Sequence, residues 1–372
     1  MTQTFKATVE RSGLLKALGR VAHVVEKRNT IPILGNIYVE VRQDDIRFRG
    51  TDLDMEVSDQ VKAEVASKGT ITVPAGLFHD IVRKLPEGSQ IVIEQLENTM
   101  TVKAGKSRFV LQTLPVSDFP DIQAGNLTHS FVVPGADLHR LIERAQFAIS
   151  TEETRYYLNG IYLHVAGSHN APTLRAVATD GHRLAQVEMP RPSGIDTMPG
   201  VIVPRKAVAE LTRLFDKDLE VTVELSVSKI RFTAGNISLT SKLIDGTFPD
   251  YVRVIPQNND KVLTIEKAIF AAAADRVATI SSERGKAVKM SLSAGKIILT
   301  VNNPDSGSAT EEIDAEYSAN AFDIGFNSRY LHDILSELEG DKVTVRLADP
   351  GSPTLFGGSD ESSLYVLMPM RV

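Results

Sequence analysis

Three similar units follow one another along the chain, and this repeat limits the possible fold more than any other feature of the sequence. Each unit opens with a short alternating strand that runs into an amphipathic helix, and these openings start at Thr4, His129 and Lys261. A second strand–helix passage comes later in each unit, starting at Ile71, Val201 and Asp323. Helices do not alternate strictly with strands, which favours an α+β class with antiparallel sheets and two helices per unit.

The first two units end alike, with LPVSDFPDI from Leu114 and LIDGTFPDY from Leu243. A proline after an aromatic residue ends a strand and leads into a linker. The pattern therefore predicts domains over 1–125, 126–256 and 257–372. Three such units could form separate beads, or an arc in which sheets join edge to edge and so remove unpaired strand edges.

Charge is distributed unevenly along the 372 residues, whose formal net charge is −6. That total argues weakly against nucleic acid as a partner. However, the helices predicted at 11–28, 75–85, 136–150, 205–217, 266–280 and 328–339 hold 16 basic and 11 acidic residues. A common helical surface would therefore be basic within an acidic protein, which would favour DNA there. The alternative is that these cations only solvate the exposed sides of the helices.

Composition excludes several classes of protein. The chain has no cysteine, which excludes disulfides and thiolate chemistry, and it has no stretch typical of a signal peptide or membrane span. We therefore expect a cytoplasmic protein with no membrane partner.

Motifs for catalysis are missing from the sequence. No phosphate-binding loop occurs, and the eight histidines lack the spacing of metal ligands. Asp52 and Asp54 could hold a metal ion in a nuclease, although a solvent-facing strand edge is the favoured interpretation. The run from Asp180 to Arg183 resembles an acid–base cluster, but Asp180-Gly181 predicts the tip of a hairpin. We expect no enzymatic activity of its own, no cofactor and no metal.

Two further segments suggest binding. Tyr156 and Tyr157 follow Arg155, and tyrosine rings can stack on bases, although one ring could equally belong to the core. The end of the chain, from Tyr365 to Val372, reads YVLMPMRV. It suits a final core strand or the wall of a peptide groove, and composition alone favours the core strand.

The longer motifs resemble those of a known family. RYYLNG from Arg155, ATDGHRLA from Ala178, VIVPRK from Val201, SKLIDGTFPDY from Ser241 and the terminal YVLMPMRV are similar to the bacterial DNA polymerase III beta subunits, the replication sliding clamps. The resemblance runs from Phe5 to Val372. It implies a DNA-clamp fold that closes into a ring around duplex DNA as a head-to-tail homodimer. Such a ring tethers the polymerase and raises its processivity as a non-catalytic subunit of a DNA-directed DNA polymerase, a nucleotidyltransferase.

The resemblance also implies residues that touch DNA without reading its sequence. Arg28, Tyr156 and Tyr157 match the family pattern, whereas Gly76 and Glu152 depart from it. The basic helical surface would add Arg11, Arg20, Arg83, Arg140 and Arg205.

Protein partners are implied in the same way: the catalytic subunit of the replicative polymerase, the clamp loader, and other polymerases and repair proteins that carry clamp-binding motifs. Their groove would comprise Leu158, Thr179, Gly181, His182, Arg183, Leu184, Pro249, Arg253, Val254, Asn327, Tyr330, Val366, Leu367, Met368, Pro369, Met370, Arg371 and Val372. This assignment replaces the core-strand interpretation of the tail. The dimer contact would pair Leu77 and Ile81 of one chain with Ile280 of the other. The rival hypotheses are a monomeric peptide-binding adaptor, which self-association would exclude, and a metal-dependent nuclease, which an Asp52→Asn variant would test.

Overall fold

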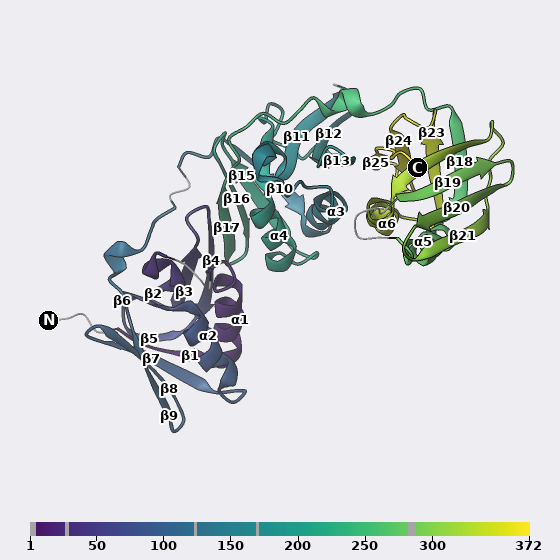
Figure 1. The fold of residues 1–372 in the computed structure, drawn as a ribbon. Coiled ribbons are helices and arrows are strands. Elements are labelled where there is room, and N and C mark those ends of the chain that lie inside the picture. The colour runs from purple at the N-terminus through teal and green to yellow at the C-terminus, as the bar shows by residue number, and fades with distance from the viewer. Residues whose placement is uncertain (1–4, 27–29, 123–124, 169–170, 282–286) are drawn as a thin grey trace. The chain divides into compact units, whose positions relative to one another are not determined.

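The structure is a computed structural model that describes residues 5–26, 30–122, 125–168, 171–281 and 287–372 (Figure 1). Within these residues the chain repeats one arrangement of strands and helices three times, as the sequence predicts. Each repeat contains two α-helices, and each of them begins at the residue directly after the end of a strand.

The first repeat is β1 (Lys6–Glu10), α1 (Arg11–Val21), β2 (Asn36–Val41), β3 (Asp45–Thr51), β4 (Met55–Lys62), β5 (Glu64–Ser67), β6 (Gly69–Pro74), α2 (Ala75–Lys84), β7 (Gln90–Leu96), β8 (Thr99–Ala104) and β9 (Ser107–Gln112). The second is β10 (His129–Pro134), α3 (Gly135–Gln146), β11 (Gly160–Ser168), β12 (Ala171–Thr179), β13 (Arg183–Pro190), β14 (Val201–Pro204), α4 (Arg205–Leu214), β15 (Glu220–Leu225), β16 (Lys229–Ala234) and β17 (Ile237–Lys242).

The third is β18 (Lys261–Glu266), α5 (Lys267–Ala278), β19 (Ala287–Ser293), β20 (Lys296–Asn303), β21 (Gly307–Asp314), β22 (Phe322–Asn327), α6 (Ser328–Glu337), β23 (Lys342–Leu347), β24 (Thr354–Gly357) and β25 (Ser363–Leu367). Short 3-10 helices connect some of these elements: η1 (Pro32–Gly35), η2 (Val116–Asp118), η3 (Glu153–Leu158) and η4 (Tyr251–Val254).

The chain divides into two compact units that cut the second repeat in half. Residues 1–136 and 209–243 form unit 1, and residues 137–208 and 244–372 form unit 2. Unit 1 holds a five-stranded sheet, β5-β1-β7-β8-β9, and an eight-stranded sheet, β10-β15-β16-β17-β4-β3-β2-β6. Unit 2 holds an eight-stranded sheet, β14-β11-β12-β13-β25-β24-β23-β18, and a four-stranded sheet, β21-β20-β19-β22.

Each eight-stranded sheet is two four-stranded sheets of neighbouring repeats joined edge to edge. In unit 1 the joint is the antiparallel pair β17–β4, with Leu239 opposite Val57. In unit 2 it is the pair β13–β25, with Leu184 opposite Val366. Of the two arrangements that the sequence left open, the joined sheets are therefore present within each unit, and the backbone groups of both edges are satisfied.

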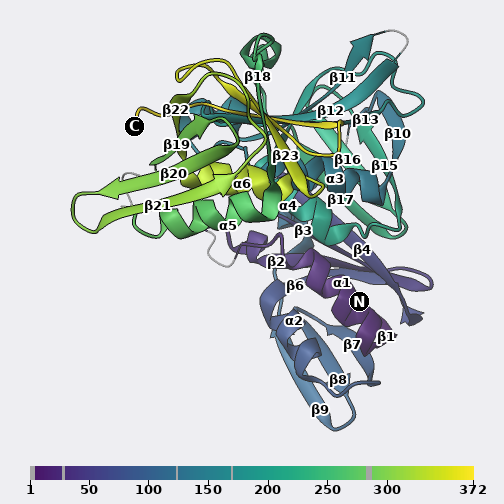
Figure 2. The ribbon, with the colours of Figure 1, turned by 90° about the vertical axis from the view of Figure 1, so that its right-hand side faces the viewer.

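Helices cover one face of the sheets. In unit 1, α1 packs on β3 and β4 and lies beside α2; in unit 2, α5 lies beside α6 and packs on β20 and β21 (Figure 2). Gly50 permits the close approach of α1, since a Cβ there would lie 2.6 Å from the carbonyl oxygen of Val21. Alternate residues of β3 and β19 are buried, as period-two patterning requires.

All six predicted helices are present, but each ends earlier than predicted, the first by the most. α1 ends at Val21 instead of reaching residue 28. The Arg213 guanidinium donates hydrogen bonds to the last carbonyl groups of α1, at Gly19 and Arg20, with distances of 3.5 and 3.0 Å. A cation at this end satisfies carbonyls that no later turn could satisfy. With the observed bounds the six helices hold 13 basic and 7 acidic residues. No helix of the described residues is long and apolar enough to cross a membrane.

Candidate binding surfaces

A cluster of apolar side chains lies beside the β13–β25 joint, on the sheet face opposite Tyr365. Its buried members are Leu158, Val177, Leu184, Ile202, Phe248, Tyr251 and Val366, and Tyr157, Tyr162, Ile244, Ile255 and Leu355 pack against them while still partly exposed. We call this set the joint cluster. Six strands and two 3-10 helices contribute to it, so it forms only when distant segments meet. It brings together three predicted groove residues: Leu158, Leu184 and Val366.

Arg183 anchors one side of this region. Its guanidinium lies 2.5 Å from Asp333, 3.1 Å from Asp180 and 2.6 Å from the carbonyl oxygen of Phe147. It also lies over the ring of Tyr330 at 4.3 Å. Because its donors are paired, Arg183 positions α6 against the β12–β13 hairpin instead of offering a free charge.

The β12–β13 turn holds the next predicted residues. The carboxylate of Asp180 accepts hydrogen bonds from the backbone N–H groups of His182 and Arg183, and Gly181 has a φ of +89°. The predicted hairpin tip is confirmed. Thr179 Oγ1 donates to the carbonyl of Arg183, and the His182 ring stacks near Tyr330 at 6.2 Å. Burial raises the pKa of the Tyr330 hydroxyl, which therefore stays a neutral donor at physiological pH.

The C-terminal tail combines both interpretations considered from sequence. Tyr365, Val366 and Leu367 are buried in β25, at the middle of an eight-stranded sheet. Beyond them the N–H of Met368 donates to the His182 carbonyl, and the N–H of Met370 donates to the Gly325 carbonyl. This path leaves Met370 and Val372 exposed beside a surface pocket lined by Asp323, Ile324, Gly325, Pro350, Gly351, Pro369, Met370, Arg371 and Val372.

The other predicted groove residues are less uniform. Pro249, Arg253 and Val254 are exposed, on or just before η4. The side-chain oxygen of Asn327 caps α6 by accepting from the N–H groups of Arg329 and Tyr330. Leu367 is fully buried and packs in the core of the sheet.

The two tyrosines predicted to touch DNA lie together on η3. Tyr156 is 53% exposed, and its ring meets that of Tyr157 edge to face at 5.7 Å. Tyr157 also packs on the joint cluster. Tyr156 is therefore the ring exposed for a ligand, and Tyr157 contributes in part to the core. Glu152 pairs with Arg155 at 2.5–2.8 Å, which neutralises its charge near the tyrosines.

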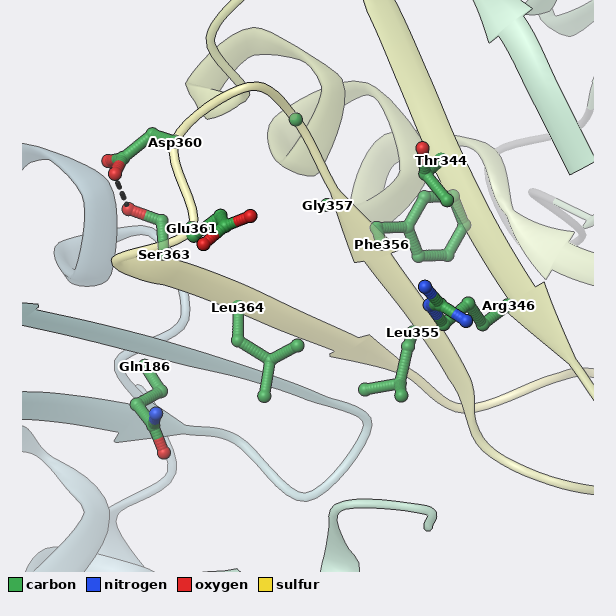
Figure 3. Close-up of a pocket in the computed structure, with 11 residues that line it drawn as sticks. Gln186, Thr344, Arg346, Leu355, Phe356, Gly357, Asp360, Glu361, Ser363 and Leu364 are labelled. Carbon is green, nitrogen blue, oxygen red and sulfur yellow. Dashed lines mark hydrogen bonds between the residues drawn. The ribbon is translucent and has the colours of Figure 1, made fainter. Parts of the chain in front are cut away.

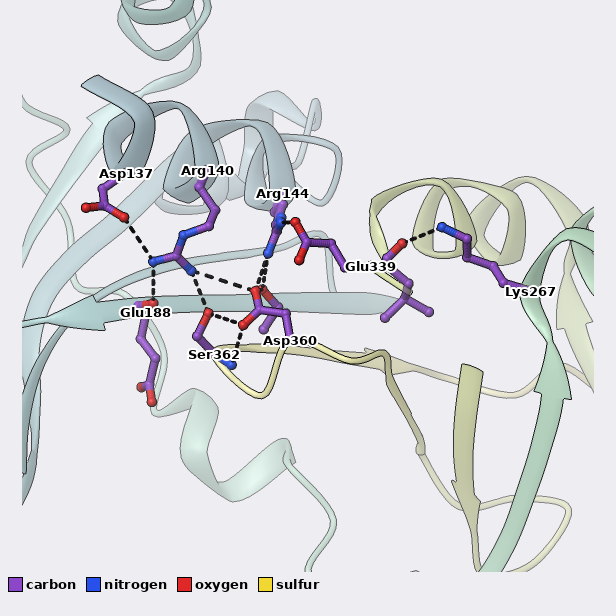
Figure 4. A network of polar contacts seen from close by, with 10 residues as sticks. Asp137, Arg140, Arg144, Glu188, Lys267, Glu339, Asp360 and Ser362 are labelled. Carbon is purple, nitrogen blue, oxygen red and sulfur yellow. Dashed lines mark hydrogen bonds and ion pairs between the residues drawn. The ribbon is translucent and has the colours of Figure 1, made fainter. Parts of the chain in front are cut away.

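The predicted DNA-contacting arginines fall into two groups. Arg11 donates to the carbonyls of Val82 and Arg83, Arg20 pairs with the buried Asp59 at 3.0 Å, and Arg140 donates to Ser362 and to the Glu188 carbonyl (Figure 4). Their charge remains, but their donors are largely occupied. By contrast Arg83 and Arg205 are exposed, and Arg83 pairs with Asp80 at the surface. Arg28 lies outside the described residues.

The predicted dimer residues differ in exposure. Leu77, on α2, is 54% exposed, whereas Ile81 is only 9% exposed. Ile280 follows α5, is partly buried, and accepts a hydrogen bond from Asn303 at its carbonyl. Sequence reasoning did not identify Phe109 and Val110, which are 37% and 49% exposed on the edge strand β9. The available signal was the apolar run from Phe109 to Leu111, because it breaks the alternation that a half-buried strand shows.

The acidic pair considered for a nuclease forms a turn. Asp52 Oδ1 accepts from the N–H groups of Asp54 and Met55, and Asp54 pairs with Lys242 at 3.1 Å. The two residues lie in the β3–β4 loop instead of on a strand. No group of three or more metal-ligating side chains occurs among the residues that the structure describes.

Three repeats whose sheets join edge to edge, with an apolar cluster beside one of the joints, define a clamp-type scaffold. Family models of the DNA polymerase III beta subunit match its N-terminal domain at residues 5–123, its central domain at 132–250 and its C-terminal domain at 252–371. The chain belongs to this family.

Individual relatives agree with the family models. The chain is 50% identical to the beta sliding clamp of Caulobacter vibrioides, over 99% of this chain and all of that one. It is 40% identical to the beta sliding clamp of Escherichia coli K12 with the same coverage. Among solved structures, a sliding clamp from Bartonella birtlesii bound to griselimycin has a TM-score of 0.96 and 50% identity, covering 99% of this chain and all of that one. The function is therefore that of a sliding clamp in DNA replication, and the predicted three-domain clamp fold is confirmed, whereas the domain boundaries at 125 and 256 stay a prediction.

Proposed function

We propose that two copies of this chain close head to tail into a ring around duplex DNA, and that the ring tethers the replicative polymerase. The observation that carries this proposal is a pair of matching open strand edges. Each of the joints β17–β4 and β13–β25 pairs the last strand of one repeat with a strand of the neighbouring repeat. That partner is the third strand after the first helix of its repeat. Among the described strands the same two positions are occupied by β9 and β21, and each has only one neighbour.

The repeat also gives the register of the missing joint. Phe109 of β9 corresponds to Leu239 of β17, because the preceding turns align Ala104–Ser107 with Ala234–Ile237. Ala309 of β21 corresponds to Val57 of β4 by the same comparison of hairpins. Since Leu239 faces Val57, we expect Phe109 to face Ala309 of the second copy. Lys106 then faces Glu312.

Charge and apolarity of the two edges are complementary. Lys106 and Arg108 make the β9 end basic, and Glu311, Glu312 and Asp314 make β21 acidic. Phe109 and Val110 add exposed apolar area, as does Leu77 on the neighbouring helix. A small apolar interface with charged surroundings would bind two copies and still allow a clamp loader to open the ring.

The helices would supply the electrostatic part of DNA binding. Their excess of basic residues attracts phosphates without reading bases. Exposed cations such as Arg83 and Arg205 can exchange one phosphate of the DNA backbone for the next as the protein slides. Tyr156 offers an exposed ring for a nearby sugar or base. A ring needs no tight contact, so the protein can slide.

The joint cluster and the tail would hold linear motifs of the polymerase catalytic subunit, the clamp loader and other clamp-binding proteins. An apolar floor beside the exposed Met370 adapts to several sequences. Tethering through this groove raises the effective concentration of the polymerase at the primer end, and the clamp takes no chemical part in nucleotidyl transfer.

Retention on circular DNA tests the proposal. The protein is loaded by a clamp loader and ATP onto nicked circular DNA, and half of the sample is then linearised in salt that screens phosphate contacts. We expect retention on the circle and loss from the free ends. Equal release from both would contradict a closed ring and favour the monomeric adaptor.

A further inference from the structure

A pocket of about 460 Å³ lies on the joined sheet of unit 2, at strands β13, β25, β24 and β23. None of its lining residues belongs to the groove predicted from the sequence. It is lined by Gln186, Thr344, Arg346, Leu355, Phe356, Gly357, Gly358, Asp360, Glu361, Ser363 and Leu364 (Figure 3).

Strand register makes this pocket continuous with the groove. Directly paired residues on one face of an antiparallel sheet are neighbours. One such row crosses six of the eight strands, and its members are Thr179, Leu184, Val366, Leu355, Arg346 and Val262. The first three are groove residues. Leu355 packs on the joint cluster and also lines the pocket, so it connects the two.

The neighbouring row has an opening at its centre. Thr344 pairs with Gly357, and Leu364 pairs with Gln186. A Cβ on Gly357 would meet no atom within 4 Å, so the strand surface is uncovered there. Glycine inside a strand often marks a place where another chain approaches closely. Gln186 Oε1 is buried and has no hydrogen-bond partner within the described residues. If the Gln186 amide turned toward the pocket, a peptide N–H could satisfy this oxygen.

The charges along the pocket are separated. Arg346 is exposed at the β23 end, and its guanidinium has no ion-pair or hydrogen-bond partner in the part of the chain that the structure describes. Glu361 and Asp360 lie at the other end. Glu361 is exposed, whereas the carboxylate of Asp360 pairs with Arg144 and accepts hydrogen bonds from Ser362 and Ser363. A carboxylate would therefore be attracted to the Arg346 end and repelled from the Glu361 end.

We propose that the partner-binding surface extends beyond the groove onto this pocket. The occupant is the stretch of partner chain that flanks the segment held in the groove. It places an apolar side chain over Gly357, between Leu355 and Leu364, and an Asp or Glu on Arg346. The inference rests on the proposed groove function, and it assigns the flanking residues of clamp-binding segments a part in setting affinity.

The test uses fluorescent peptides from the polymerase catalytic subunit of the same organism. One peptide contains only the groove-binding segment. In a second series this segment keeps flanks of eight residues on each side, and a single Asp is moved through otherwise neutral flanks. We expect one flank position at which Asp tightens binding roughly threefold to fivefold, which is typical of a partly exposed ion pair, and the gain should fall in high salt.

Two variants assign the gain to the pocket. Arg346→Glu should remove the gain from Asp and transfer it to Lys at the same position, which isolates the pair as a double-mutant cycle does. Gly357→Val should fill the opening and weaken flanked peptides while leaving the affinity of the short peptide unchanged. Lys16→Glu, an equal charge change on α1 in the other unit, is the control and should leave every affinity unchanged.

The outcomes separate the two proposals. If the short peptide fails to bind, the groove function itself is wrong. If it binds but no flank position responds to Arg346→Glu, the extension is overturned and the groove stands. A response to charge without any effect of Gly357→Val would overturn the apolar contact over Gly357.

Discussion

The two sheet joints inside the chain are built alike but differ in what lies on the face away from the helices. At the β13–β25 joint the repeat places Val177, Leu184 and Val366, all of them apolar. The corresponding positions at the β17–β4 joint hold Arg49, Glu56 and Thr240. There a small cluster of Ile33, Leu34, Phe119 and Tyr38 takes the place of the joint cluster.

Arg49 closes this second position. Its guanidinium lies over the rings of Tyr38 and Phe119 at 4.4 and 5.6 Å, and it pairs with Asp121 at 3.1 Å and Glu56 at 3.5 Å. Burial raises the pKa of Glu56, although Arg49 opposes this. The same backbone joint therefore carries a filled polar contact in one unit and an apolar cluster in the other. We infer that these three side chains decide which joint can bind a partner.

Polar contacts around the joints also differ. At β17–β4, the buried Glu210 binds His23 and Arg213, and Asp54 binds Lys242. At β13–β25, Arg140 and Arg144 of α3 hold the loop before β25 through Asp360 and Ser362, and Arg144 also pairs with Glu339, between α6 and β23 (Figure 4). This second network holds the loop that leads into β25, the strand that carries Val366 of the predicted groove.

The largest effect should come from removing the tail beside the apolar joint. Deleting Met368 to Val372 leaves β25 intact, since this strand ends at Leu367. We expect peptide, polymerase and clamp-loader binding to fall below detection, a loss of at least about a hundredfold. Fluorescence anisotropy measures the peptide, and sedimentation measures the dimer. Loss of the dimer as well would mean that the tail is part of the structural core.

Charge reversal at the joint between two copies should have a smaller effect. Lys106→Glu alone should weaken the dimer by roughly threefold to tenfold, because it faces Glu312 in the proposed register. Combining it with Glu312→Lys should restore much of the affinity. Sedimentation equilibrium at low salt checks both variants, with Lys16→Glu as the control. No recovery in the double variant would contradict the register of β9 against β21.

Converting the polar joint into an apolar one should create a weak second site. The variant Arg49→Val, Glu56→Leu, Thr240→Val removes the whole polar contact, and replacement of a buried ion pair as a set is often tolerated. We expect calorimetry to detect a second peptide bound per chain. Its affinity should be roughly tenfold or more weaker than that of the β13–β25 site, because no tail covers the new site. Arg49→Ala alone is the control, and it leaves Glu56 without its partner. If the triple variant folds yet binds only one peptide, apolar identity at these three positions is insufficient.

The smallest effect should be a loss of stability of the loop before β25 at low pH. Burial alone would raise the pKa of Asp360, but hydrogen bonds from Ser362 and Ser363 and the charge of Arg144 lower it to about 2. A depressed pKa contributes stability that is present above about 3.8 and is lost as the pH falls toward 2. Pepsin should therefore cut the loop before β25 more readily as the pH falls from 4 to 2. In Asp360→Asn the loop should already be cut at pH 4, and cleavage of the β3–β4 loop serves as the internal reference. Equal sensitivity of wild type and variant at pH 4 would contradict this role.

Much of the fold could be predicted because its signals are local. Strand alternation, the strand–helix passages and the Asp180-Gly181 turn depend on neighbouring residues, and all of them appear in the structure. The end of α1 could not be predicted from local sequence, since its last carbonyl groups accept hydrogen bonds from Arg213 of another repeat. The ion pairs Arg20–Asp59 and Arg183–Asp333 could not be predicted either, because each joins segments far apart in sequence. The groove residues came from family resemblance, and the residues that close the other joint became visible only when the two joints were compared.

The central claim is that each chain offers one partner site, at the β13–β25 joint. Titration of the assembled protein with the short polymerase-derived peptide that contains only the groove-binding segment, followed by hydrogen exchange with and without this peptide, tests it most directly. We predict one peptide per chain, with protection confined to segments around Leu158, Leu184, Phe248 and the tail. Two peptides per chain, or protection around Tyr38 and Phe119, would contradict the claim.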